Sequence, residues 1–218
     1  MLTVYGRHNS ANVQKVLWML GELGLDYERI NVGGSFGGND DAGYLRLNPN
    51  GKVPTLVDGE LALFESNAIV RYLAARYGGE RWWPADPAVR AVGDKWLDWQ
   101  LSTLADALGP VFVATIKTEP ERRDEAAIAR GAARLHGCWQ ILQPALEAKP
   151  YLGGTEPGIA DIVLGTMFAR YRALPIVHLE MPALDAWFAR LSERPACRTH
   201  VLRPIGTTPG EWARLERG

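Results

Sequence analysis

Three short segments of the sequence place hydroxyl, amide and carboxylate side chains where an expected helix or strand begins. In the first segment, Asn9, Ser10 and Asn12 directly precede an apolar stripe of helical period. A Ser or Asn at this place usually caps the helix by accepting hydrogen bonds from free backbone N–H groups. The alternative is that a hydroxyl donor and the positive end of the helix together bind an anion. The residues alone leave both interpretations open.

The other two segments are Lys52-Val53-Pro54 and Glu65-Ser66. Without further context, the former is most simply a turn followed by an edge strand. A cis bond before Pro54 would instead turn the backbone of Val53 toward an extended peptide ligand. Ser66 is a natural N-cap and Glu65 a natural first-turn carboxylate. The same pair would also suit an amino-acid head group, with Glu65 binding the ammonium and Ser66 the carboxylate.

The elements that must position these segments follow from apolar periodicity. Residues 2–5 and 26–32 have the pattern of strands. Residues 13–23 between them predict an amphipathic helix that stops at Gly24, with Lys15 off the apolar stripe. A strand, a helical crossover and a strand make a βαβ unit, whose two strands are parallel.

A hairpin and a second helix are expected to complete this unit. A loop rich in Gly and polar residues occupies residues 33–43, and an Asp-Gly turn joins strand-like residues 55–57 and 60–64. Residues 68–77 then repeat at helical spacing and end at a Gly-Gly pair. Residues 1–79 are therefore predicted to form an α/β domain of order βαβββα with a mixed four-stranded sheet.

The composition changes after residue 79. Residues 80–88 are rich in Trp and Pro without either period, which is typical of a linker. Residues 89–218 show helical stripes and no convincing strand pattern, so they are predicted to form an all-helical domain. The expected helices lie within residues 89–103, 127–146, 159–174 and 183–192.

Charge and cysteine usage exclude several classes of protein. The 24 Lys and Arg residues against 25 Asp and Glu leave no basic footprint for nucleic acid or for an anionic membrane surface. Cys138 and Cys197 lie far apart, and the lack of ligand spacing argues against a disulfide scaffold and a metal site. Any thiol chemistry must therefore use a thiol from elsewhere. The first residues do not resemble a secretory signal, so we expect a cytoplasmic protein.

The order of these features resembles the cytosolic-type glutathione S-transferases, in particular bacterial members with a Ser/Asn-type active site. The resemblance covers essentially the whole chain. It includes a helix-capping Ser/Thr-x-x-Asp motif in which Gly158 takes the place of the hydroxyl residue. The matching positions are Ser10, Lys52-Val53-Pro54, Glu65-Ser66, Gly158-Ile159-Ala160-Asp161 and Arg194-Pro195.

The resemblance implies a thioredoxin-like N-terminal domain that binds glutathione, a helical C-terminal domain that supplies most of the pocket for a hydrophobic co-substrate, and a two-fold homodimer. It implies that Ser10, assisted by Asn12, stabilises the glutathione thiolate, with Asn9 and Asn12 as alternative donors. The residues expected to bind glutathione are Asn9, Lys52, Val53, Pro54, Glu65 and Ser66. The candidates for the co-substrate pocket are Phe112, Ile116 and Tyr171.

Three functions are compatible with this resemblance. The leading prediction is a detoxifying glutathione transferase, in which the thiolate attacks a hydrophobic electrophile. The nearest alternative is a glutathione-dependent disulfide or peroxide reductase, which the Asn-rich start of the first helix suits and which needs no protein cysteine. The second alternative is a non-catalytic glutathione-binding or partner protein, because a fold alone does not confer activity. Glutathione is the expected co-substrate in the first two, and no metal is expected.

Overall fold

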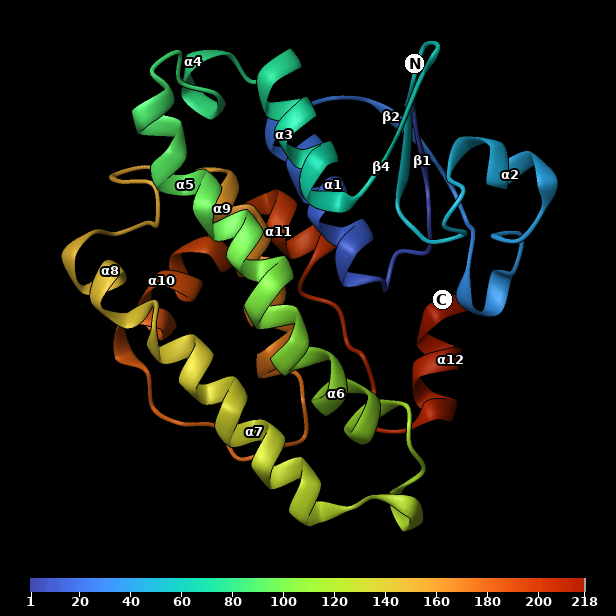
Figure 1. Cartoon of the computed structure of the whole chain (residues 1–218), viewed down its shortest axis with the longest axis vertical. Helices are drawn as coiled ribbons and strands as arrows, with labels where there is room; N and C mark the ends of the chain where they lie inside the picture. The colour runs from blue at the N-terminus through green and yellow to red at the C-terminus, as the bar shows by residue number, and fades with distance from the viewer. Residues whose placement is uncertain (218) are drawn as a thin grey trace.

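A mixed four-stranded sheet forms the first part of the molecule. The computed structural model describes residues 1–217. The strands are β1 (Leu2–Tyr5), β2 (Tyr27–Ile30), β3 (Thr55–Asp58) and β4 (Leu61–Phe64). Their order is β2-β1-β3-β4 (Figure 1). The parallel β1–β2 pair, the β3–β4 hairpin and the mixed sheet are as the sequence predicts, and the antiparallel β1–β3 pair joins the two halves.

Two helices cover this sheet and connect it to the rest of the chain. Helix α1 (Ala11–Leu23) ends at Gly24, whose φ of 62° lies in the left-handed region that favours glycine. Helix α3 (Ser66–Tyr77) begins slightly before the predicted start and packs against α1. Helix α1 also packs on α9 and α11, so every residue from 13 to 20 is buried. The helix predicted as amphipathic is therefore surrounded by protein.

One short helical piece lies within the predicted Gly-rich loop of residues 33–43, and a second begins at its end. These are the 3₁₀ turn η1 (Gly34–Phe36) and helix α2 (Ala42–Leu47). Of the six residues of α2, only Tyr44 is buried. A helix this short spans less than two turns and buries one side chain, so it leaves no apolar period to detect in the sequence.

The second part of the described chain, from residue 89 to residue 217, is built from helices, in agreement with the sequence. Helix α9 lies at its centre and buries twelve of its fourteen residues. The long helices α5, α6 and α7 run beside it, and the C-terminal α12 lies below the α2 region (Figure 1). No helix within the described residues has the length and apolar character that crossing a membrane requires. The elements are α4 (Gly79–Trp82), α5 (Pro87–Trp99), the π-helix η2 (Gln100–Leu104), α6 (Ala105–Ile116), η3 (Pro120–Arg122), α7 (Glu125–Gln140), α8 (Gln143–Ala148), α9 (Ile159–Arg172), α10 (Pro182–Ser192), α11 (Pro195–His200) and α12 (Pro209–Arg217).

Several helix boundaries differ from the sequence prediction. The helix expected over residues 127–146 is divided into α7 and α8 because the ring of Pro144 clashes with the carbonyl four residues earlier, at Gln140, where α7 ends. Helix α6 contains the pair Gly109-Pro110, which in sequence is typical of a break. The short helices α11 and α12 and the four-residue α4, within the expected linker, were likewise not predicted.

Candidate functional site

Ser10 stands at the N-terminus of α1, where the sequence predicts either a cap or an anion site. Its backbone is extended (φ −71°, ψ 121°), and its carbonyl accepts the first helical hydrogen bond from Gln14 N at 2.9 Å. Within residues 1–217, the hydroxyl of Ser10 makes no capping bond to α1. The side chain instead lines a cavity of about 310 Å³. Ser10 and the positive end of α1 thus both lie at the cavity wall, where an anion could bind.

A buried lysine connects the start of α1 to the start of α3. Lys15 has no exposed surface, and its Nζ donates to Ser66 Oγ at 3.3 Å, to Asn67 Oδ1 at 3.0 Å and to Gln100 Oε1 at 2.7 Å. Ser66 Oγ in turn donates to Asn12 Oδ1 at 3.3 Å. We call these five residues the Lys15 cluster. It brings two of the predicted site residues, Asn12 and Ser66, into contact although they are 54 positions apart.

The position of Lys15 corrects the sequence analysis, which placed this residue off the buried stripe of its helix. Helix α1 is covered on all sides by packed elements, so the polar face expected at Lys15 meets protein and not water. Burial lowers the pKa of Lys15 from 10.5 to about 7, and the negative charge of Glu65 partly opposes this shift. No local pattern could have revealed this, because the three acceptors come from α3 and η2.

Stability should therefore depend on pH through Lys15. Between pH 7 and about 10, the unfolded lysine holds a proton that the folded lysine releases, so the free energy of unfolding rises with pH, by at most about 1.4 kcal/mol per pH unit. We expect Lys15→Met to remove this contribution and to flatten the profile. Urea unfolding of both proteins at pH 7, 8 and 9 measures the difference, in which other titrating groups cancel. Parallel profiles for the two proteins would contradict the assignment.

Helix α2 holds the Lys52-Val53-Pro54 segment in place. Tyr44 Oη donates to the carbonyl of Lys52 at 2.5 Å, and Asn48 Nδ2 donates to the same carbonyl at 2.7 Å. Both side chains also contact Thr55 Oγ1, at 2.8 Å and 3.2 Å. The Val53–Pro54 bond is cis, which was the less favoured of the two alternatives at the sequence level. Sequence reasoning missed the two residues that anchor this segment, Tyr44 of α2 and Asn48 directly after that helix.

Glu65 has an unusual backbone conformation directly before α3. Its φ of 70° and ψ of 109° make it the one non-glycine residue with positive φ among residues 1–217. Such conformations cost on the order of 1–3 kcal/mol and cluster at functional sites. The Glu65 side chain is exposed, so packing gives no reason to keep a side chain here. The positive φ of Glu65 is therefore not explained by the packing of its side chain.

The cavity at Ser10 is walled by segments from both parts of the chain. The loop before α1 and the first residues of α1 form one side, and η2, α6, α9 and α12 form the other. Asn12 lines it beside Ser10, whereas Asn9 is buried behind them with its carbonyl accepting from Arg170 Nη2 at 2.6 Å. The larger apolar side chains of the lining are those of Leu101, Leu108, Phe112, Met167 and Trp212.

Of the three side chains expected at a co-substrate pocket, one lies there. Phe112 lines the cavity and packs edge-on against Trp212, with ring centroids 5.1 Å apart. Ile116 and Tyr171 have no exposed surface and belong to the core, where Tyr171 contacts Phe168 and other aromatic rings. The expectation that they face the pocket is therefore corrected. Helical period indicates which residues share a face but not which face meets a cavity.

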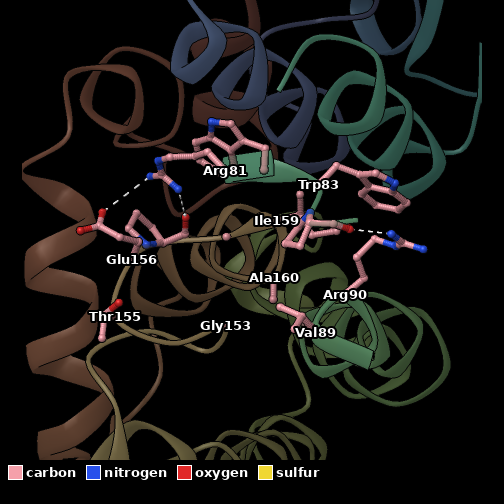
Figure 2. Close-up of a pocket in the computed structure, with 14 residues that line it drawn as sticks. Arg81, Trp83, Val89, Arg90, Gly153, Thr155, Glu156, Ile159 and Ala160 are labelled. Carbon is pink, nitrogen blue, oxygen red and sulfur yellow. Dashed lines mark hydrogen bonds and ion pairs between the residues drawn. The ribbon is translucent and has the colours of Figure 1, made fainter. Parts of the chain in front are cut away.

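A second pocket lies at the junction between α4, α5 and the start of α9 (Figure 2). Arg81 donates to the carbonyl of Pro157 at 3.0 Å and pairs with Glu156 at 3.8 Å. Arg90 donates to the carbonyl of Pro84 at 2.5 Å on the other side of this pocket. Both arginines are hydrogen-bonded to backbone carbonyls. We therefore interpret the residues around this pocket as the contact between the linker and the start of α9.

Comparisons with known proteins connect this geometry to a family. A family model described as "Glutathione S-transferase, N-terminal domain" matches residues 1–75, and one described as "Glutathione S-transferase, C-terminal domain" matches residues 125–199. The chain is 42% identical over 207 residues to glutathione S-transferase GstB of Escherichia coli, with 94% of this chain and 100% of that protein covered. It is also 33% identical over 202 residues to the disulfide-bond oxidoreductase YfcG of the same organism, with 88% and 91% covered.

A solved structure agrees with these relatives. The theta class glutathione S-transferase from Xanthomonas axonopodis pv. citri, crystallised with glutathione bound, superposes with a TM-score of 0.90 at 45% identity. The match covers 94% of this chain and 99% of that chain. Both family models, a relative aligned over nearly the full chain and a structure with the same fold are all glutathione S-transferases. This chain therefore belongs to the glutathione S-transferase family.

Proposed function

We propose that this protein is a glutathione transferase that activates the glutathione thiol as a thiolate for attack on an electrophile. The observation that carries the proposal is the shared cavity. Ser10, at the N-terminus of α1, lies in one wall, and the opposite wall comes from the helical part and is mainly apolar. A thiolate and an apolar electrophile placed in one cavity have the proximity that the reaction needs.

The glutathione site in this proposal uses the residues expected from the resemblance. The backbone of Val53, before Pro54, pairs with the cysteinyl unit, and Lys52 lies toward the glycyl end. Glu65 and Ser66 bind the ammonium and the carboxylate of the γ-glutamyl head. Residues 1–79 would thus bind glutathione, and residues 89–218, after the linker at 80–88, would supply the co-substrate pocket.

Activation of the thiol requires a modest amount of energy. A free thiol has a pKa near ~8.5, so only a few per cent is ionised at neutral pH. Lowering the pKa by about two units takes roughly 2.7 kcal/mol, which one hydroxyl hydrogen bond and a helix N-terminus together can supply. Ser10 donates to the sulfur, Asn12 assists, and Asn9 is the alternative donor.

Glu65 offers a test of the glutathione site that separates binding from folding. We expect Glu65→Gly to raise the KM for glutathione about tenfold or more, because a charge-assisted bond to the ammonium is lost. We expect the same variant to unfold at an equal or higher temperature, since glycine relieves the positive φ. Steady-state kinetics and thermal unfolding measure the two effects. A variant with wild-type KM would remove Glu65 from the site.

Two assays separate the transferase from its nearest alternative. Disulfide reduction is a specific candidate because one relative aligned over 88% of this chain is named a disulfide-bond oxidoreductase. Purified protein is assayed with glutathione and either 1-chloro-2,4-dinitrobenzene or 2-hydroxyethyl disulfide. We expect turnover of the first substrate. Turnover of the second alone would replace transferase activity by glutathione-dependent reduction.

Loss of glutathione binding would favour a different role. If glutathione-agarose failed to retain the protein and calorimetry detected no binding, a non-catalytic role would be favoured.

We also propose a cytoplasmic two-fold homodimer. Exposed apolar side chains on β4 and α5 suit such an interface, and light scattering tests it. These side chains are Leu61 and Phe64 on β4 and Val89 and Val92 on α5.

A further inference from the structure

The apolar cavity at Ser10 is bordered by three basic side chains. Arg7 comes from the loop before α1, Lys117 follows α6, and Arg170 lies on α9. Lys117 Nζ is 4.3 Å from the ring centroid of Trp212, and the Arg170 guanidinium is 5.1 Å from the same ring. Three segments far apart in the sequence thus place positive charge around one aromatic wall.

Arg170 is the most deeply buried of the three. It is 6% exposed, and its Nη2 donates to the Asn9 carbonyl at 2.6 Å and to Gln14 Oε1 at 3.3 Å. Its Nη1 is buried and has no hydrogen-bond partner among the described residues. Burial, with the nearby charge of Arg7, lowers the pKa of Arg170 to about 10, so the side chain is still a cation at neutral pH. A buried cation with only neutral acceptors is costly, and an anion nearby would compensate it.

One carboxylate faces these cations. Glu216 of α12 pairs with Arg7 at 2.7 Å and accepts from Ser35 N at 2.6 Å. Burial tends to raise the pKa of Glu216, but Ser35, Arg7 and Lys117 lower it below its usual range, so the side chain is ionised. Residues 1–217 contain no ion pair to Lys117 or Arg170. The cavity therefore carries an excess of about two positive charges.

We propose that the co-substrates of this protein are electrophiles with an aromatic or apolar body and an anionic substituent such as a carboxylate. The inference rests on the proposed transferase function and names its substrate class. The body packs on Phe112, Met167 and Trp212, and the anionic group lies toward Lys117 and the uncompensated Arg170. Pockets of this kind use a few placed charges to orient a ligand whose remaining surface is apolar.

The reaction on such a substrate is an ordinary substitution. Ionised glutathione attacks the ring carbon that bears chlorine in 4-chloro-3-nitrobenzoate, and a carbon–sulfur bond forms. The carbon–chlorine bond breaks and its electron pair leaves with chloride. The thiol proton has already passed to solvent. The carboxylate does not react, so any preference for it reports binding orientation alone. The methyl ester of the same compound is the neutral counterpart of matched shape.

The test compares kcat/KM for the acid and for its methyl ester, each divided by its uncatalysed rate with glutathione. In wild-type protein we expect the acid to show the larger enhancement. In Lys117→Gln we expect the acid-to-ester ratio to fall about fivefold, as loss of one partly exposed charge implies. Because a changed thiolate pKa alters both rates equally, the ratio isolates the anionic group. Lys117 is exposed, so the variant is expected to fold.

A matched control is available on α5. Lys95 is exposed and lies 5.4 Å from the ring centroid of Trp96, but it does not line this cavity. We expect Lys95→Gln to keep the wild-type ratio. A ratio that is equal in all three proteins, or an ester that is preferred throughout, would overturn the inference while leaving transferase activity intact. Turnover of neither compound, together with no glutathione binding, would instead overturn the proposed function and the inference with it.

Discussion

Replacing Ser10 with alanine is expected to lower kcat with 1-chloro-2,4-dinitrobenzene about ten- to a hundredfold at pH 6, while the KM for glutathione changes little. The lost hydrogen bond to a thiolate corresponds to about 1.5–3 kcal/mol, or one to two units in the pKa of the bound thiol. At a pH below the thiol pKa of both proteins, each unit by which the variant raises that pKa lowers the thiolate fraction about tenfold. The deficit should therefore narrow as the pH approaches 9.

The ultraviolet absorbance of the thiolate, titrated in the glutathione complex, measures this pKa directly. Ser102→Ala is the matched control, because Ser102 is exposed on η2 and does not line the cavity. An unchanged thiolate titration in Ser10→Ala would transfer the role to Asn9 or Asn12. Asn12→Ala then distinguishes these two, since Asn12 lines the cavity and Asn9 lies behind it.

Replacing Asp161 with alanine is expected to lower the free energy of unfolding by about 3–5 kcal/mol. Asp161 has no exposed surface, and Oδ1 accepts from Leu152 N at 3.0 Å and from Trp187 Nε1 at 2.7 Å. Oδ2 accepts from Gly158 N at 2.8 Å. The variant leaves these three donors without their acceptor at the start of α9, two of them in buried surroundings. Urea unfolding measures the loss.

Asp185 provides the comparison within the same chain. It lies in the first turn of α10, is only partly buried, and accepts from Met181 N at a longer 3.4 Å. We expect Asp185→Ala to cost less than about 1 kcal/mol. Asp161→Asn, which keeps one oxygen, should fall between the two alanine variants. Equal losses for Asp161→Ala and Asp185→Ala would show that burial of the capping carboxylate is unimportant.

The N-terminal fold could be predicted well because its signals are local. A strand shows a period of two, a helix shows one near 3.6, and the Asp-Gly pair between β3 and β4 marks a hairpin. Gly24 marks the end of α1 because its φ of 62° is a conformation in which other residues are disfavoured. Each of these signals lies within about ten residues, and no distant partner is needed to interpret it.

The helical part was predicted less completely because its helices depend on each other. Helix α6 forms through Gly109-Pro110 because it packs on α7 and η2, and α12 is held by the Glu216 pair with Arg7. The two residues of this ion pair are 209 positions apart in the sequence. Local propensity is a weak guide when tertiary packing overrides it.

The candidate site divides in the same way. Its three polar segments could be recognised from sequence by residue type and order, and the structure brings Asn12 and Ser66 together as one cluster. The co-substrate side could not, because Phe112 lines the cavity while Ile116, one turn further on the same helix, is fully buried. Two adjacent residues of α9 also differ in their surroundings, because Arg170 lines the cavity whereas Tyr171 lies in the core.

By itself, the sequence determined the four strands of the mixed sheet, the helices α1 and α3, the helical nature of the second part and the polar residue types available for binding a thiolate and a peptide. Only the tertiary structure decided that Lys15 is buried, that Trp212 lines the cavity, that Glu216 pairs with Arg7, and that Arg170 has an unpaired guanidinium nitrogen among the described residues. The physical reason is that burial and electrostatic environment are set by the elements packed around a side chain. For α1 those elements are α3, α9 and α11. They begin between 43 and 172 residues after the end of α1 at Leu23, with α3 starting at Ser66 and α11 at Pro195.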